Sequence, residues 1–148
     1  MPKPLLSLIS ILCANEEIQL IAMLFESYHS YRQIFTDGRP FPEDREPAWY
    51  GYSIGKWDKD TLVVDTVGIN EATWLDDNGH PHSDALQVTE RFRRVDFGHM
   101  DVQITIDDPK AYKRPWTVRL AWELMPDTDF ILSRSSWSWF SILFWQSK

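Results

Sequence analysis

"DALQVTERFRRVDFGHMDVQITIDD", residues 84–108, is the stretch that decides the fold. In 84–95 the apolar residues recur at every second position, which is the period of a strand with one buried face. "DFGH" (96–99) carries turn residues, and "MDVQITIDD" (100–108) follows as a second extended run. This stretch therefore predicts a β-hairpin.

The same pattern extends along the chain in both directions. A second hairpin is predicted where "DKD" (58–60) separates two extended runs, and no helical period is evident. Short strands at this spacing are typical of an all-β barrel or sandwich. We expect an antiparallel lipocalin-like barrel of about eight strands with room for one small ligand. The predicted strands are 17–26, 27–39, 49–57, 61–69, 84–95, 100–108, 116–124 and 130–137.

Size and composition suit one domain, residues 1–148, with segments 1–16 and 138–148 peripheral or covered in a dimer. The net charge of -7 disfavours nucleic acid and anionic membrane as partners. Cys13 is the only cysteine, so no intramolecular disulfide forms and a cytoplasmic location is expected. The apolar run 5–12 after Lys3 leaves a secreted or periplasmic location as the alternative.

Several blocks of the chain resemble a family of uncharacterised bacterial proteins that look lipocalin-like. The resemblance runs from about Tyr31 to Asp127. It implies a calycin-type barrel with an apolar pocket, and it implies no established reaction. The shared blocks are G-Y-S-x-G-x-W (51–57), D-T-L-V-V-D-T (60–66), T-W-L-D (73–76), G-H-P-H-S (79–83) and T-E-R-F-R-R (89–94). The aromatic, serine-rich end of the chain departs from the pattern of the family.

Glu90 is the first candidate for chemistry. It lies in phase with the apolar residues of 84–95, whereas Arg91 and Arg93 lie on the opposite face, so we expect Glu90 to point into the barrel. A buried carboxylate either takes up a proton or finds a donor, and both outcomes suit a general acid or base. The alternative is a purely structural pair with an internal arginine such as Arg32, or with a tyrosine.

His80 and His82 form an H-P-H turn before that strand. Two rings that face one way are a candidate chelate with Glu90 or His99, but no third ligand has a diagnostic spacing. We therefore predict no metal and no cofactor. One histidine is instead expected at the barrel mouth as a proton carrier or donor, with a structural latch of the loop as the alternative.

Large rings are the expected wall of the pocket, because the chain has eight tryptophans. On 49–57, either face can line the lumen. Trp74 is either a lid or a plug at the barrel end, and the plug is favoured slightly. The candidate ligand-binding residues are Tyr50, Tyr52, Trp74, Val88, Phe92 and Trp122.

Three classes of function remain open on the sequence. The first is binding of a small apolar or aromatic molecule. The second is a cofactor-independent lyase, isomerase or cyclase that uses Glu90, His80 or His82 for proton transfer. The third is a structural or interaction module filled by its own aromatic residues. A homodimer is expected, because 17–26 is apolar on both faces and the aromatic tail adds further apolar surface.

Overall fold

The computed structural model describes residues 10–14, 19–25, 30–76 and 78–124. They form one sheet whose strands follow each other in chain order. The strands are β1 (Ser10–Ala14), β2 (Leu20–Phe25), β3 (Ser30–Phe35), β4 (Tyr52–Asp58), β5 (Thr61–Val67), β6 (Gln87–Arg94), β7 (His99–Asp107) and β8 (Trp116–Glu123). Within these ranges there is no helix long and apolar enough to span a bilayer.

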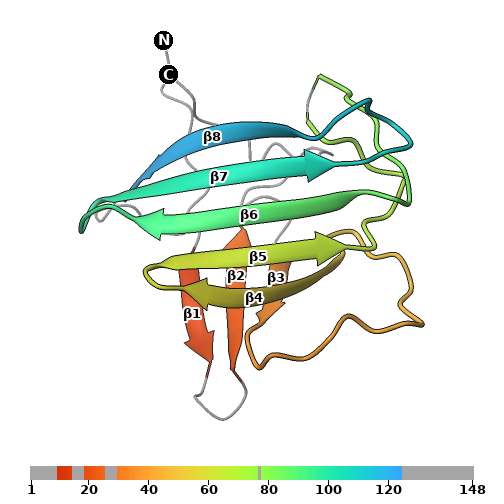
Figure 1. The fold of residues 1–148 in the computed structure, drawn as a ribbon. Helices are drawn as coiled ribbons and strands as arrows, with labels where there is room; N and C mark the ends of the chain where they lie inside the picture. The colour runs from red at the N-terminus through yellow and green to blue at the C-terminus, as the bar shows by residue number, and fades with distance from the viewer. Residues whose placement is uncertain (1–9, 15–18, 26–29, 77, 125–148) are drawn as a thin grey trace.

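The sheet curls over itself instead of lying flat. Figure 1 shows β5 to β8 running side by side across the view, while β1 to β3 cross behind them at a steep angle. All neighbouring strands are antiparallel except β3 and β4, which are parallel. Among the described residues no pairing joins β1 to β8, so the protein is a curled half-barrel that is open rather than closed.

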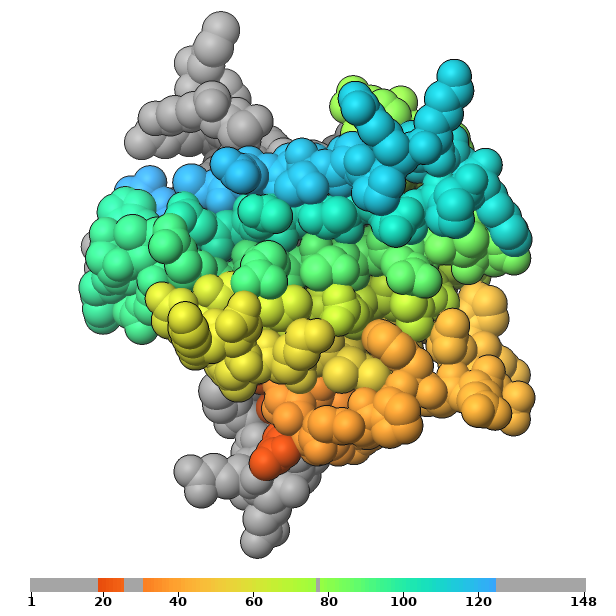
Figure 2. Space-filling model, in the orientation of Figure 1, coloured from red at the N-terminus to blue at the C-terminus, as the bar shows by residue number. Residues whose placement is uncertain are grey.

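The parallel pair corrects the expectation of an entirely antiparallel sheet. An antiparallel neighbour needs only a short turn, but residues 36–51 carry the chain back along β3 before β4 begins. Figure 2 shows part of this connection, in light orange, projecting beyond the end of β4 and β5. The pair is also short, because only Ile34 with Ser53 and Phe35 with Ile54 are in register.

Most of the predicted strands are confirmed, including both hairpins. In the described part of the run 27–39 the strand covers β3, and β1 lies in a segment for which no strand was predicted. The predicted strand 130–137 and the tail 138–148 lie outside the described residues, as do residues 1–9 and 15–18 of the N-terminal region.

The concave side of the sheet holds the core. Alternate residues of β2 to β8 point inward, as period-two patterning requires. The buried apolar side chains are Ile21, Met23, Phe25, Ile34, Leu62, Val64, Ile69, Leu75, Leu86, Val88, Phe92, Val102, Ile104, Ile106 and Leu120. Trp116, Val118 and Trp122 of β8 are half-buried against this cluster.

Gly55 permits β3 and β4 to come together. A Cβ atom at Gly55 would lie 2.8 Å from Cγ2 of Ile34 and 3.1 Å from Cγ2 of Thr36. Both atoms belong to branched side chains at the short parallel junction, so neither is free to move away. The φ of Gly55 is not positive, so the backbone conformation does not require glycine here. The close approach of the two strands requires it instead.

We predict that Gly55→Ala lowers the free energy of unfolding by about 1–3 kcal/mol, because the added methyl overpacks the junction. Urea unfolding measures this directly. Gly98→Ala is the matched control, since its Cβ would meet only Asp96 Oδ1 at 3.8 Å, and it should change stability by less than about 1 kcal/mol. Equal effects of the two substitutions would contradict the account of the junction.

Candidate functional site

The polar centre of the interior is an ion pair between β6 and β3. Glu90 is 0% exposed and Arg32 is 4% exposed. Arg32 Nη1 donates to Glu90 Oε1 at 3.0 Å, and Nη2 donates to Oε2 at 2.5 Å. This is the two-point geometry in which a guanidinium binds a carboxylate most strongly.

Two hydroxyl groups complete the pair. Arg32 Nε donates to Ser53 Oγ at 2.9 Å, and Nη2 also donates to Thr66 Oγ1 at 2.6 Å. The two hydroxyl oxygens lie 3.0 Å from each other. The guanidinium of β3 therefore contacts side chains of β4, β5 and β6, and both buried charges are paired and hydrogen-bonded, as burial requires.

The phase argument for Glu90 is confirmed, since it is buried while Arg93 on the opposite face is exposed. Of the structural partners named from the sequence, Arg32 is the one observed. Ser53 and Thr66 were missed. A period-two pattern in β5 was the available signal, because it places Thr66 on the same inner face as Leu62 and Val64.

Asp76 organises the turn that contains the first histidine. Its Oδ1 accepts the backbone N–H of Asn78 at 3.0 Å and of His80 at 3.2 Å. Its Oδ2 lies 2.6 Å from His80 Nδ1, and Leu75 N–H donates to the carbonyl of His80 at 2.8 Å. His80 therefore closes a tight loop, with its side chain 52% exposed.

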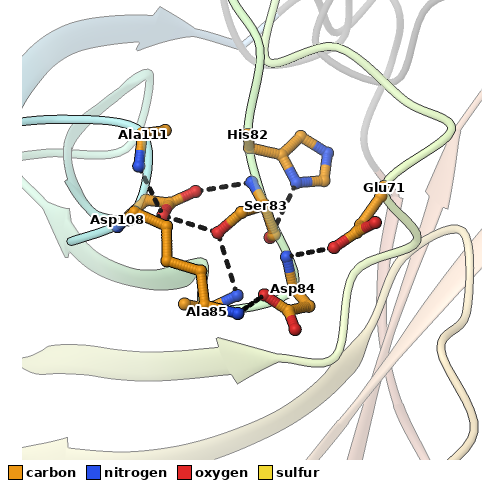
Figure 3. Close-up of polar contacts among 8 residues, drawn as sticks. Glu71, His82, Ser83, Asp84, Ala85, Asp108 and Ala111 are labelled. Atoms are coloured by element: carbon orange, nitrogen blue, oxygen red, sulfur yellow. Dashed lines mark hydrogen bonds and ion pairs between the residues drawn. The ribbon is translucent and has the colours of Figure 1, made fainter.

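His82 and Ser83 fasten the same loop to the rest of the molecule. His82 Nε2 lies 2.7 Å from Thr73 Oγ1. Ser83 donates its backbone N–H to Asp108 Oδ2 at 2.6 Å and its hydroxyl to Oδ1 at 2.7 Å. Figure 3 shows this contact, with the His82 ring directed away from Asp108. Tyr112 OH adds a bond to the carbonyl of Pro81 at 2.8 Å.

The structure does not bring the two histidines and Glu90 together. None of the hydrogen bonds described for either ring goes to Glu90, whose two oxygens are held by Arg32. The two rings also bond different groups, and His99 bonds Asp96 in the β6–β7 turn. Within the described ranges no group of three or more candidate ligands could hold a metal ion. This geometry fits the alternative in which the H-P-H turn is a structural latch of the loop.

Two buried carboxylates, Asp76 and Asp108, have pKa values below their ordinary range. Burial raises the pKa of Asp108, but the hydrogen bonds from Ser83, Ala111 and Lys110 outweigh it and lower the pKa. Burial likewise raises the pKa of Asp76, and the bonds from His80 and Asn78 more than reverse this effect. Both groups are therefore held as charged anchors of the loop 70–86.

The aromatic candidates divide between the two sides of the sheet. Tyr50 stacks on buried Phe25 at 5.6 Å between ring centroids, at the edge of the core. Tyr52 is on the opposite face from Ser53 and stacks on Phe35 at 5.2 Å, so it lies outside the interior.

Trp74 does not plug the end of the sheet. It is 59% exposed, and the adjacent Leu75, at 0%, occupies the buried position instead. Nothing in its surroundings distinguishes a lid from an ordinary exposed side chain.

The remaining candidates lie on the concave side. Val88 and Phe92 are core residues, 1% and 5% exposed, and Trp122 packs against Phe92 at 5.6 Å between centroids. Trp116 carries a feature that the sequence does not reveal. Its Nε1 is buried and has no hydrogen-bond partner among the groups that the structure describes.

The arginines after Glu90 lie at a solvated edge of the sheet. Arg91 pairs with Asp58 at 2.9 Å, and Arg93 pairs with Asp101 at 2.8 Å on the neighbouring strand. Arg94 donates to the carbonyls of Asp96 and Phe97 in the turn. These contacts are exposed and contribute little to stability.

Fold and site define an all-β protein with a curled, open sheet and a buried arginine–glutamate centre. No protein-family model matches the sequence, and no curated protein or solved structure matches it either. The lipocalin-like resemblance is therefore supported only as far as the curled β-sheet.

We predict that Asp108 makes the protein acid-sensitive. Because its folded pKa lies below the unfolded value near 3.8, its stabilisation is complete above that value and is lost as pH falls through the folded pKa. The unfolding free energy of the wild type should therefore fall between about pH 5 and about pH 2.5, and less steeply in Asp108→Asn.

Urea titrations across this range measure the slope. Ser83→Ala removes one of the bonds that lower the pKa, so its slope should be intermediate. An Asp108→Asn slope as steep as that of the wild type would refute the assignment.

Proposed function

We propose that this protein binds a small apolar or aromatic molecule against the concave side of its sheet. The inner apolar side chains of β5 to β7 are buried except for Met100, whereas three of the four inner side chains of β8 keep part of their surface exposed. Trp116, Val118 and Trp122 are the half-buried residues of that row. Half-buried rings on a concave apolar wall are typical of ligand sites.

The single observation that carries the proposal is the indole N–H of Trp116, which has no acceptor among the described residues. A buried donor without an acceptor costs about 1–3 kcal/mol, so native proteins usually satisfy it. Tyr112 contacts the Trp116 ring edge-to-face at 5.8 Å between centroids but donates its own hydroxyl to Pro81. A ligand with a carbonyl or ether oxygen would supply the missing acceptor.

The resemblance to lipocalin-like proteins also supports small-molecule binding, and a lipocalin-like relationship stays part of the proposal. Acid–base catalysis has less support. Glu90 is fully buried and both of its oxygens accept hydrogen bonds from Arg32, so a substrate would reach it only if the packed core opened. His80 and His82 take part in loop contacts.

Two fluorescent naphthalenes test the proposal. Prodan carries a ketone oxygen, and N-phenyl-1-naphthylamine has a similar aromatic body without a carbonyl. Both should bind with blue-shifted emission. Trp116→Phe should weaken prodan about tenfold, the equivalent of one hydrogen bond of about 1.4 kcal/mol, and should affect the second probe less.

Trp49→Phe is the matched control, because Trp49 is 57% exposed and does not pack against the core cluster. It should leave both affinities unchanged. If neither probe binds, or if the two tryptophan substitutions change the affinities equally, the proposal is wrong.

A further inference from the structure

Among the described residues, the backbone groups along the outer edge of β8 have no strand partner. Leu124 N–H donates to the carbonyl of Gly98 at 2.7 Å, and β7 and β8 are antiparallel in that register. Because hydrogen-bonded residues alternate along an antiparallel strand, the even-numbered residues of β8 bond β7. The N–H and C=O groups of the odd-numbered residues 117–123 therefore point away from β7. None of the pairings made by the described residues engages this edge.

Within its own described residues, β8 carries neither a proline, nor a bulge, nor an inward charge that would protect this edge against pairing. Edge strands are commonly guarded by proline, by a bulge or by a charge that points inward. Between Trp116 and Glu123 there is no proline, the register with β7 is continuous, and the inward residues are all apolar. The charged side chains, Arg119 and Glu123, are exposed on the outer face.

The charges on this edge are complementary to themselves. Arg119 and Glu123 lie two residues on either side of Ala121. A second copy placed antiparallel about a twofold axis at Ala121 would set Arg119 opposite the partner's Glu123, and the same contact would recur on the other side of the axis. All of the paired positions are odd-numbered, so the free backbone groups face each other in hydrogen-bonding register.

We propose that two copies of this chain pair through β8 in that register and form one continuous sheet. The three facing pairs centred on Ala121 supply about six backbone hydrogen bonds. On the inner face, Leu120 then lies opposite the partner's Trp122, and Val118 lies opposite the partner's Leu124. This covers the half-buried Trp122 and also Leu124, which is 46% exposed. Opposite charges and apolar pairs directly across a sheet both stabilise it.

Charge reversal tests the register. Sedimentation velocity of the full chain over about 1–100 μM should show a dimer. Arg119→Glu and Glu123→Arg should each weaken it tenfold or more, because each places like charges opposite each other twice. The double variant should restore the wild-type affinity. Arg93→Glu, an equal charge change on the outer face of β6, should have no effect.

Amide hydrogen exchange provides a second readout. In the dimer the amides of Arg119, Ala121 and Glu123 should be protected, and they should exchange faster in the single charge variants. A monomeric wild type overturns the proposal. This holds also if the amides of the β8 edge are protected in the monomer by another segment of the same chain. A dimer that is indifferent to the charge reversals overturns it as well.

Discussion

The buried contact between Arg32 and Glu90 is the interaction on which this fold depends. Among the described residues, the strand pairing between the first three strands and the last five consists of two residue pairs, between β3 and β4. Arg32 extends from β3 across that junction to Ser53, Thr66 and Glu90, on the next three strands. The Arg32 side chain thus holds the two parts of the sheet together, a task that a longer ladder of backbone hydrogen bonds would otherwise perform. Gly55 allows the close approach of β3 and β4 at the junction.

This arrangement also limits what Glu90 can do. A buried ion pair is costly to desolvate, and its value lies in the penalty for losing one partner, which leaves an uncompensated charge. Glu90 is therefore fixed by its partner in the interior and does not reach the surface. The proposed binding surfaces lie elsewhere, along β8. In the described part of the chain, the rings of this strand are half-buried, and the indole N–H of Trp116 has no acceptor. The outer edge of β8 has no strand partner there either.

Local patterning explains how much of this could be predicted from the sequence. Alternation in 84–108 predicts the β6–β7 hairpin and the inward direction of Glu90, because both depend on neighbours within the same strand. The parallel β3–β4 pair depends on where the connection 36–51 returns, which no local pattern records. A structural latch was one of the roles predicted for the H-P-H turn, but its partners escaped prediction for a similar reason: they are Thr73, Asp76 and Asp108, and Asp108 is 25 residues from Ser83.

A double-mutant cycle on the ion pair tests the central claim most directly. Arg32→Met and Glu90→Leu should each lower the free energy of unfolding in urea by about 3–5 kcal/mol, because each leaves one buried charge unpaired. The double variant removes both charges, so its loss should be smaller than the sum of the single losses by about 2 kcal/mol or more. If a single variant fails to fold and the double variant folds, this also shows that the two losses are not additive. Strictly additive losses, or single losses below about 1 kcal/mol, would contradict the claim that this pair holds the two parts of the sheet together.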